Sequence, residues 1–258
     1  MSGLEILWII LIGAVPGFLA TWLGIGGCFL RIPMMMALLA LGIKEAYFVN
    51  MAVIAVSTIP GVITHFRMRH VYTRGFIVAA IGAAAGVLLG TQLAIFAPSA
   101  TLKTIFGIAC IGIGIYMVYM AHRGRGKEPP RVTIDMVANI EHGLKLGGLM
   151  FVAGIATGLC GFGGGIYYMP ILTALGYPMH IAIGTSSTMM IPVAAIGATN
   201  LGVQGYASWL YVVAIGAVTL LFSWTGARAT KTMKAWLLRA IFGILISIIG
   251  ISVTIGLI

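Results

Sequence analysis

Long apolar runs separated by short polar segments are the dominant pattern along the chain. A helix needs about 20 apolar residues to cross the hydrocarbon core of a bilayer, at about 1.5 Å per residue. Runs of that quality cover residues 4–24, 46–66, 75–97, 101–121, 147–165, 180–201, 208–228 and 236–257. Two further runs, 28–42 and 166–177, are shorter, and each follows a glycine cluster. The pattern predicts an all-α polytopic membrane protein with about eight full spans and two short or re-entrant segments.

The two halves of the chain repeat each other. Residues 17–33 (GFLATWLGIGGCFLRIP) and 154–170 (GIATGLCGFGGGIYYMP) share glycine and proline positions, and residues 65–82 align with 199–216. A period of about 135 residues makes each unit a whole helical bundle rather than a solenoid repeat. We therefore expect a first membrane repeat at 1–121, a linker at 122–146 and a second membrane repeat at 147–258.

The distribution of Lys and Arg predicts that the two repeats have opposite orientations. Three arginines lie in the loop at 67–74, whereas the equivalent loop at 201–207 has no charge. The loop at 98–100 is uncharged, whereas its counterpart at 228–239 and the linker at 122–146 are basic. Positive loops stay cytoplasmic, so equivalent loops fall on opposite sides of the membrane. The pattern is that of an inverted-topology repeat with Gly/Pro-broken helices. Inversion requires an odd number of crossings per copy, and both possible counts, five or three, meet this requirement.

The composition agrees with a multi-pass protein embedded in a lipid bilayer. Hydrophobic residues make up 60% of the chain, charged residues only 8%, and the mean hydropathy is +1.10. A soluble domain carries roughly 25% charged residues. The net charge of +10 comes from basic residues in loops between apolar spans, so we do not expect nucleic acid as a partner.

The glycine clusters are the first candidate binding site. They contribute Gly26 and Gly27 in the first copy, and Gly163, Gly164 and Gly165 in the second. Interrupted helices at matching positions of inverted repeats indicate a transport site near the membrane midplane. Free backbone N–H groups at the start of the following helix suit an anion. The alternative is that these glycines only permit close helix packing.

Polar side chains in the apolar runs extend this candidate site. Thr185, Ser186 and Ser187 lie together near the start of one run, and Asn50 occupies the equivalent region of the first copy. Arg31 stands alone in the short run at 28–42 and could pair with an oxyanion. The alternatives are ordinary packing for the hydroxyls and snorkelling to an interface for Arg31.

Acidic residues and enzyme motifs are informative by their absence from the sequence. No Asp or Glu lies centrally in an apolar run, which argues against a cation site and favours an anion. The glycine segment at 161–165 is not followed by the Gly-Lys-Ser/Thr of a phosphate-binding loop, and no zinc spacing or paired carboxylates occur. We expect neither an enzyme, nor a cofactor, nor a resident metal. Cys28 and Cys160 flank the glycine clusters and leave open a thiol or soft-metal function.

The doubled GxxxGxxGxGG…P pattern, followed by AIGTSS at residues 182–187, resembles the TauE/SafE sulfite exporter family, also called the toluene sulfonate uptake permease family. The first copy departs from this pattern, with Cys28 at the third glycine and Asn50 near the expected Thr-Ser pair. The resemblance implies a secondary transporter, exporter or importer, in a prokaryotic inner membrane. Its substrates would be small sulfur-containing anions such as sulfite, thiosulfate or organosulfonates, carried by alternating access at the repeat interface. A passive anion channel is the alternative, and a homodimer and proton coupling remain open.

Overall fold

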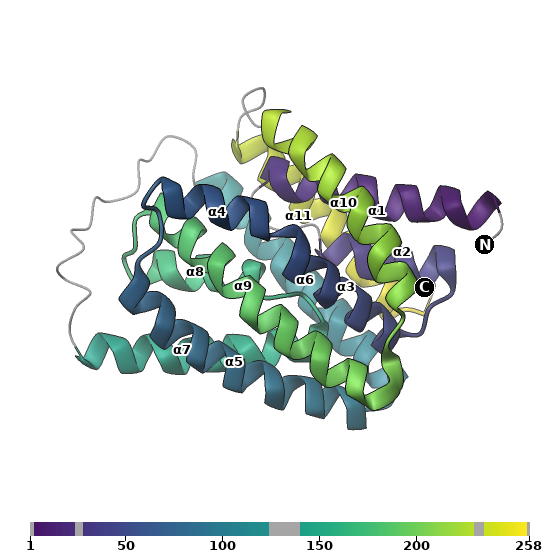
Figure 1. Ribbon diagram of the computed structural model, residues 1–258, viewed down its shortest axis with the longest axis horizontal. Helices are drawn as coiled ribbons and strands as arrows, with labels where there is room; N and C mark the ends of the chain where they lie inside the picture. The colour runs from purple at the N-terminus through teal and green to yellow at the C-terminus, as the bar shows by residue number, and fades with distance from the viewer. Residues whose placement is uncertain (1–2, 24–27, 124–139, 230–234, 257–258) are drawn as a thin grey trace.

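The computed structural model describes residues 3–23, 28–123, 140–229 and 235–256, and these ranges contain helices and no strand. The helices are α1 (Gly3–Leu23), α2 (Cys28–Leu39), α3 (Ile43–Ser57), α4 (Ile59–Arg67), α5 (Thr73–Phe96), α6 (Ser99–Arg123), α7 (Ile140–Cys160), α8 (Gly165–Ala174), α9 (Met179–Leu201), α10 (Trp209–Ala229) and α11 (Ala235–Thr254). A π-helical turn at Gly202–Tyr206 extends α9. The predicted all-α class is confirmed (Figure 1).

Five of the described helical segments are long and apolar enough to cross a membrane. They are Ile43–Arg67, Gly75–Phe96, Ser99–Tyr119, Gly143–Cys160 and Ile181–Tyr206. Large apolar side chains such as Phe96, Val152 and Leu221 are exposed on the surface of the bundle. An exposed apolar surface of this extent is stable against lipid and not against water. The total of eight spans stays a prediction.

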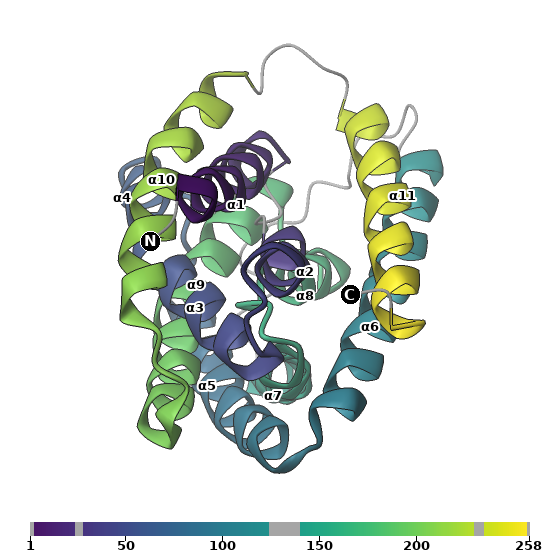
Figure 2. The ribbon, with the colours of Figure 1, turned by 90° about the vertical axis from the view of Figure 1, so that its right-hand side faces the viewer.

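Two short helices, α2 and α8, lie in the middle of the bundle (Figure 2). They contain 12 and 10 residues, so each is about 15–18 Å long against a hydrocarbon core of about 30 Å. α7 ends at Cys160, five residues before the end of its apolar run, and the chain is non-helical until α8 begins at Gly165. The predicted break in the second copy is therefore present, whereas the first break, with Gly26 and Gly27, lies outside the described residues.

Glycines bring three helix pairs into close contact: α5 with α7, α6 with α11, and α1 with α10. On α5, the faces of Gly82, Gly86 and Gly90 lie against backbone carbonyl groups of α7. A Cβ atom at any of these three positions would overlap that backbone, so the glycines are what permits the approach. These contacts stabilise pairs of helices that come from different halves of the chain.

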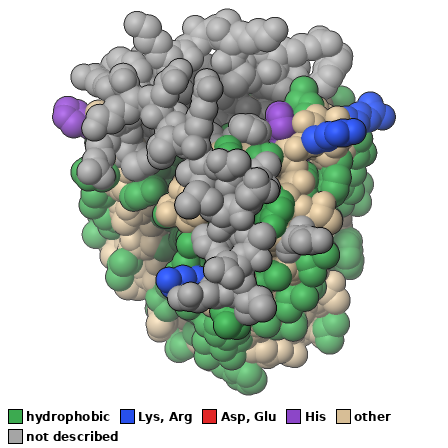
Figure 3. Space-filling view, turned by 90° about the vertical axis from the view of Figure 1, so that its left-hand side faces the viewer, with side chains coloured by type: hydrophobic (Ala, Val, Ile, Leu, Met, Phe, Trp, Pro, Cys, Tyr) green, Lys and Arg blue, Asp and Glu red, His purple; other side chains and the backbone are tan. Residues whose placement is uncertain are grey.

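The two ends of the bundle differ in charge. The ends of the chain lie on one side, and the α4–α5 turn and the start of α7 lie on the other (Figure 1). Arg67 and Arg69 beside that turn are exposed, as is Lys145 near the start of α7. Figure 3 shows Lys, Arg and His side chains on this face, and no acidic side chain among its described atoms. The described parts of two segments that were predicted to be cytoplasmic, the loop at 67–74 and the end of the linker, therefore lie at the same end of the molecule, whereas residues 230–234 of the third segment lie outside the described residues.

Candidate functional site

Arg31 is buried in the centre of the bundle. It lies in the first turn of α2 with 2% of its surface exposed, and it is the largest fully buried side chain of the described residues. Its Nη1 donates a hydrogen bond to Asn50 Oδ1 at 3.0 Å, and its Nη2 donates to Thr219 Oγ1 at 3.4 Å. The guanidinium therefore stays in the interior instead of snorkelling to an interface.

Asn50 connects Arg31 to the second glycine break. The side chain is fully buried in α3, and its Nδ2 donates a 2.6 Å hydrogen bond to the carbonyl oxygen of Gly161. The orientation of the amide follows from its neighbours, because a guanidinium only donates and a carbonyl only accepts. Asn50 of α3 thus holds the point at which α7 stops being helical.

The contact lies at the middle of α10. Thr219 is the eleventh of the 21 residues of this helix. Its side chain is 1% exposed and its backbone packs against Gly17 of α1. A charged side chain buried among the helices of a membrane protein is costly, and such a residue commonly has a function.

The two hydrogen bonds orient the Arg31 guanidinium within the bundle. Their acceptors are an amide oxygen and a hydroxyl oxygen. A buried positive charge of this kind favours an anion as a ligand over a cation.

The break itself is a buried turn with left-handed glycines. Residues 161–165 are all buried, and Gly161, Gly163 and Gly164 have φ values of 67°, 68° and 90°. A Cβ at Gly161 would meet the Tyr47 ring, and one at Gly164 would overlap the Tyr168 ring. Only glycine combines this backbone conformation with so little space.

The turn also presents backbone donors. The N–H groups of Tyr167 and Tyr168 both bond to the Gly164 carbonyl oxygen at 3.0 Å. The N–H groups of Gly165 and Ile166, the first two residues of α8, come too early for an intrahelical partner. They lie at the positive end of the α8 dipole, which favours negative charge.

The hydroxyl cluster of α9 has a different set of contacts. Thr185 Oγ1 accepts a 3.2 Å hydrogen bond from the Tyr72 N–H, and the Ser186 hydroxyl donates to the Ile183 carbonyl oxygen. Within the described ranges, neither hydroxyl bonds to Arg31 or to the glycine turn, and Ser187 is half-buried. The cluster attaches the start of α9 to the α4–α5 turn. Nearby, burial and, to a smaller extent, the neighbouring Tyr72 together raise the pKa of Tyr177 to about 12, so Tyr177 adds no negative charge at neutral pH.

The cysteine hypothesis is only partly covered by the described residues. Cys160 is a buried free thiol, whereas the Cys28 side chain lies outside the described part. Among the side chains that are described, no group of three or more His, Cys, Asp or Glu could hold a metal ion.

Sequence reasoning missed Thr219 and did not select Tyr168 as a site residue. Thr219 is one hydroxyl in a long apolar run, and such residues are common packing residues in membrane helices. Tyr168 carried a signal, because it is the counterpart of Arg31 when the two copies are aligned.

Comparison with known proteins identifies the family of this chain. A model of the family described as "Sulfite exporter TauE/SafE" matches residues 9–253. The chain belongs to this family. The TauE/SafE protein described here is 29% identical over 198 residues to a probable membrane transporter protein of Methanocaldococcus jannaschii, covering 73% of this chain and 69% of that one.

A second relative spans almost the whole chain. The probable membrane transporter protein YdhB of Bacillus subtilis is 24% identical over 245 residues, covering 93% of the TauE/SafE chain and 95% of its own. No solved structure matches the chain. With its apolar helices, the TauE/SafE protein is an integral multi-pass membrane transporter.

Proposed function

We propose that this TauE/SafE protein is a secondary transporter of small sulfur-containing anions, such as sulfite, thiosulfate or an organosulfonate, and that the anion binds beside Arg31. The observation that carries the proposal is a guanidinium with 2% exposure that is held inside the bundle by Asn50 and Thr219. These partners fix the guanidinium in place, and its positive charge favours a negatively charged substrate.

An oxyanion suits this group better than a cation or a neutral solute. A guanidinium presents parallel N–H donors that match two oxygens of a sulfonate or sulfite head group. The glycine turn adds uncharged hydrogen-bond donors, which are the backbone N–H groups of Gly165 and Ile166 at the start of α8. Membership of the sulfite exporter family supports a sulfur oxyanion, and Arg31 supplies the physical reason for the negative charge.

The pairing of the helices supports an inverted repeat. Aligning the copies makes α1 equivalent to α7, and α5 equivalent to α10. When each helix is replaced by its counterpart, the close pair α1–α10 becomes the close pair α7–α5. The pairs α6–α11 and α3–α9 each join a helix to its own counterpart. This pattern is expected of two units related by a pseudo-twofold axis.

The helix pairs α1–α10 and α5–α7 also support a mechanism of alternating access. The hydrogen bond from Arg31 to Thr219 reaches the α1–α10 pair, and the bond from Asn50 to Gly161 reaches the end of α7 in the other pair. The glycine-packed pairs resist separation, so we expect each to move as a unit while the anion site between them opens to one side at a time. The interface between the repeats is then the place at which the substrate crosses.

Transport by purified protein in proteoliposomes tests this function. Saturable uptake of sulfite, thiosulfate or an organosulfonate, measured with and without a pH gradient, is the expected result. An excess of unlabelled anion inside the vesicles should accelerate uptake of labelled anion, because a carrier exchanges substrate and a passive channel does not. Liposomes with Arg31→Gln protein are the matched control. Equal uptake by both proteins contradicts the proposed site.

A further inference from the structure

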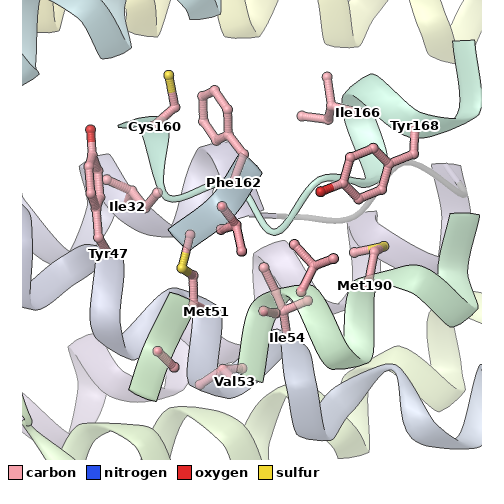
Figure 4. Close-up of a cluster of buried hydrophobic side chains, with 14 of the residues drawn as sticks. Ile32, Tyr47, Met51, Val53, Ile54, Cys160, Phe162, Ile166, Tyr168 and Met190 are labelled. Carbon is pink, nitrogen blue, oxygen red and sulfur yellow. The ribbon is translucent and has the colours of Figure 1, made fainter. Parts of the chain in front are cut away.

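Tyr168 occupies in the second copy the position of Arg31 in the first. It follows Gly164 by four residues, as Arg31 follows Gly27 by four. Its side chain has no exposed surface, and it lies in the hydrophobic cluster around the glycine turn (Figure 4). The two equivalent positions thus hold a buried guanidinium and a buried phenol.

The Tyr168 hydroxyl has no hydrogen-bond partner among the described residues. Its polar neighbour is Thr157 on α7, whose hydroxyl donates its proton to the Ala153 carbonyl oxygen at 2.7 Å. A buried hydroxyl without a partner is costly, and native proteins keep few of them. What distinguishes Tyr168 from other buried tyrosines is its place at the start of α8, where a ligand could accept from its hydroxyl.

The hydroxyl is directed at the glycine turn. The Tyr168 ring covers Gly164, and its oxygen lies 2.6 Å from the place where a Cβ on Gly164 would stand. Figure 4 shows the oxygen pointing toward the turn that runs from Phe162 to Ile166. The N–H groups of Gly165 and Ile166 belong to the start of α8, which follows Gly164 directly. The hydroxyl and the two backbone donors therefore lie at the same turn.

We propose that the Tyr168 hydroxyl and the N-terminus of α8 form a neutral subsite that accepts an oxygen of the transported anion. The inference deepens the proposed function and rests on it. Arg31 supplies charge at the Gly161 end of the turn, through Asn50, and Tyr168 supplies a hydrogen bond at the Gly164 end. The substrate class is then an anion with several oxygen acceptors, and anions without oxygen bind more weakly.

Tyr168→Phe tests the subsite because it removes one oxygen and keeps the ring against Gly164. The KM for sulfite in proteoliposomes should rise by about tenfold or more, as for a lost hydrogen bond to a charged group. The melting temperature without substrate should stay the same or rise, because the hydroxyl has no protein partner to lose. An unchanged KM overturns the inference. Thiocyanate, an anion without oxygen, serves as the comparison, and the ratio of sulfite to thiocyanate uptake should fall in Tyr168→Phe. A lower melting temperature with an unchanged ratio would also overturn the inference.

Tyr47→Phe is the matched control. Tyr47 is also fully buried with a hydroxyl that has no described partner, but it lies against Gly161 and its hydroxyl faces Cys110 and Cys160. Its removal should leave the KM unchanged. An equal rise in KM for both variants overturns the subsite, because any buried hydroxyl would then have the same effect.

The two proposals fail in distinguishable ways. If Arg31→Gln abolishes sulfite transport and Tyr168→Phe leaves the KM unchanged, the Arg31 site stands and the Tyr168 subsite is wrong. A wild-type protein that neither transports nor binds any sulfur oxyanion overturns both.

Discussion

Arg31 and Asn50 form a buried hydrogen bond of 3.0 Å between the guanidinium Nη1 and the amide Oδ1. The same amide donates to the carbonyl oxygen of Gly161 at 2.6 Å. Arg31 and the turn at which α7 ends are therefore connected through one side chain. Under the proposed function, an anion that draws Arg31 toward itself would change the forces on this turn, and this would give substrate binding a direct route to helix movement.

Asn50→Asp should abolish anion transport while the protein still inserts. A carboxylate at this position would be a permanent counter-ion for Arg31, so the substrate would lose its electrostatic advantage. It would also lose the donor to Gly161. Sulfite should protect the wild-type protein from thermal unfolding and should not protect this variant. Undiminished protection in Asn50→Asp would contradict the role of Arg31 as the partner of the anion.

Thr219→Val should have a small effect. The hydrogen bond from Arg31 Nη2 to Thr219 Oγ1 is long, at 3.4 Å, and the shape of the side chain is kept. Losing a weak neutral partner should raise the KM for sulfite by about two- to threefold. Initial rates of uptake over a range of sulfite concentrations measure this. A loss as large as that of Asn50→Asp would show that the α10 contact, and not the α3 contact, positions the guanidinium.

Gly164→Ala should inactivate transport. Gly164 has a φ of 90°, and an added methyl group would overlap the Tyr168 ring. The left-handed conformation alone costs an alanine about 1–2 kcal/mol. Gly148→Ala is the control, because Gly148 lies in α7 with open space where its Cβ would stand. Normal uptake by Gly164→Ala, at normal expression, would mean that the shape of the turn is not needed.

Cysteine labelling tests the inverted orientation. Met68 and Val203 are exposed residues in equivalent regions of the two repeats. In a background with the three native cysteines replaced by alanine, Met68→Cys and Val203→Cys should react with an impermeant maleimide from opposite sides of the membrane. This is expected because the loop at 67–74 is positively charged and should be cytoplasmic, whereas the equivalent loop at 201–207 has no charge. Labelling of both from one side would refute the inversion, and Gln204→Cys repeats the test at a neighbouring exposed position.

Helix positions were predictable because bilayer thickness dictates the length of an apolar run. The run at 75–97 became α5 at Thr73–Phe96, and the run at 180–201 became α9 at Met179–Leu201. The end of α7 differed, since the run continues to residue 165 and the helix stops at Cys160. Hydropathy does not register the left-handed glycines that stop it. α7 also begins at Ile140, within the segment predicted as linker.

The site was predictable in its components and not in its connections. Intramembrane Arg31 and the glycine turn follow from the cost of charge and the freedom of glycine. The contact between Arg31 of α2 and Thr219 of α10 depends on how these helices and α1 pack together. The hydrophobic pattern of the sequence does not reveal this packing. Thr185 was predicted as a binding residue, but in the structure its hydroxyl accepts a hydrogen bond from the Tyr72 N–H. This backbone group becomes a neighbour of Thr185 only after folding, so the sequence could not indicate the contact.

The binding of sulfite to purified wild-type and Arg31→Gln protein tests the central claim most directly. Glutamine keeps a polar side chain and removes the charge, and Arg31→Lys keeps the charge without the fork that bonds Asn50 and Thr219 together. Titration calorimetry should show saturable binding to the wild type, affinity reduced by about tenfold or more in Arg31→Lys, and no measurable binding to Arg31→Gln. Equal affinity of wild-type and Arg31→Gln protein for sulfite would contradict the account.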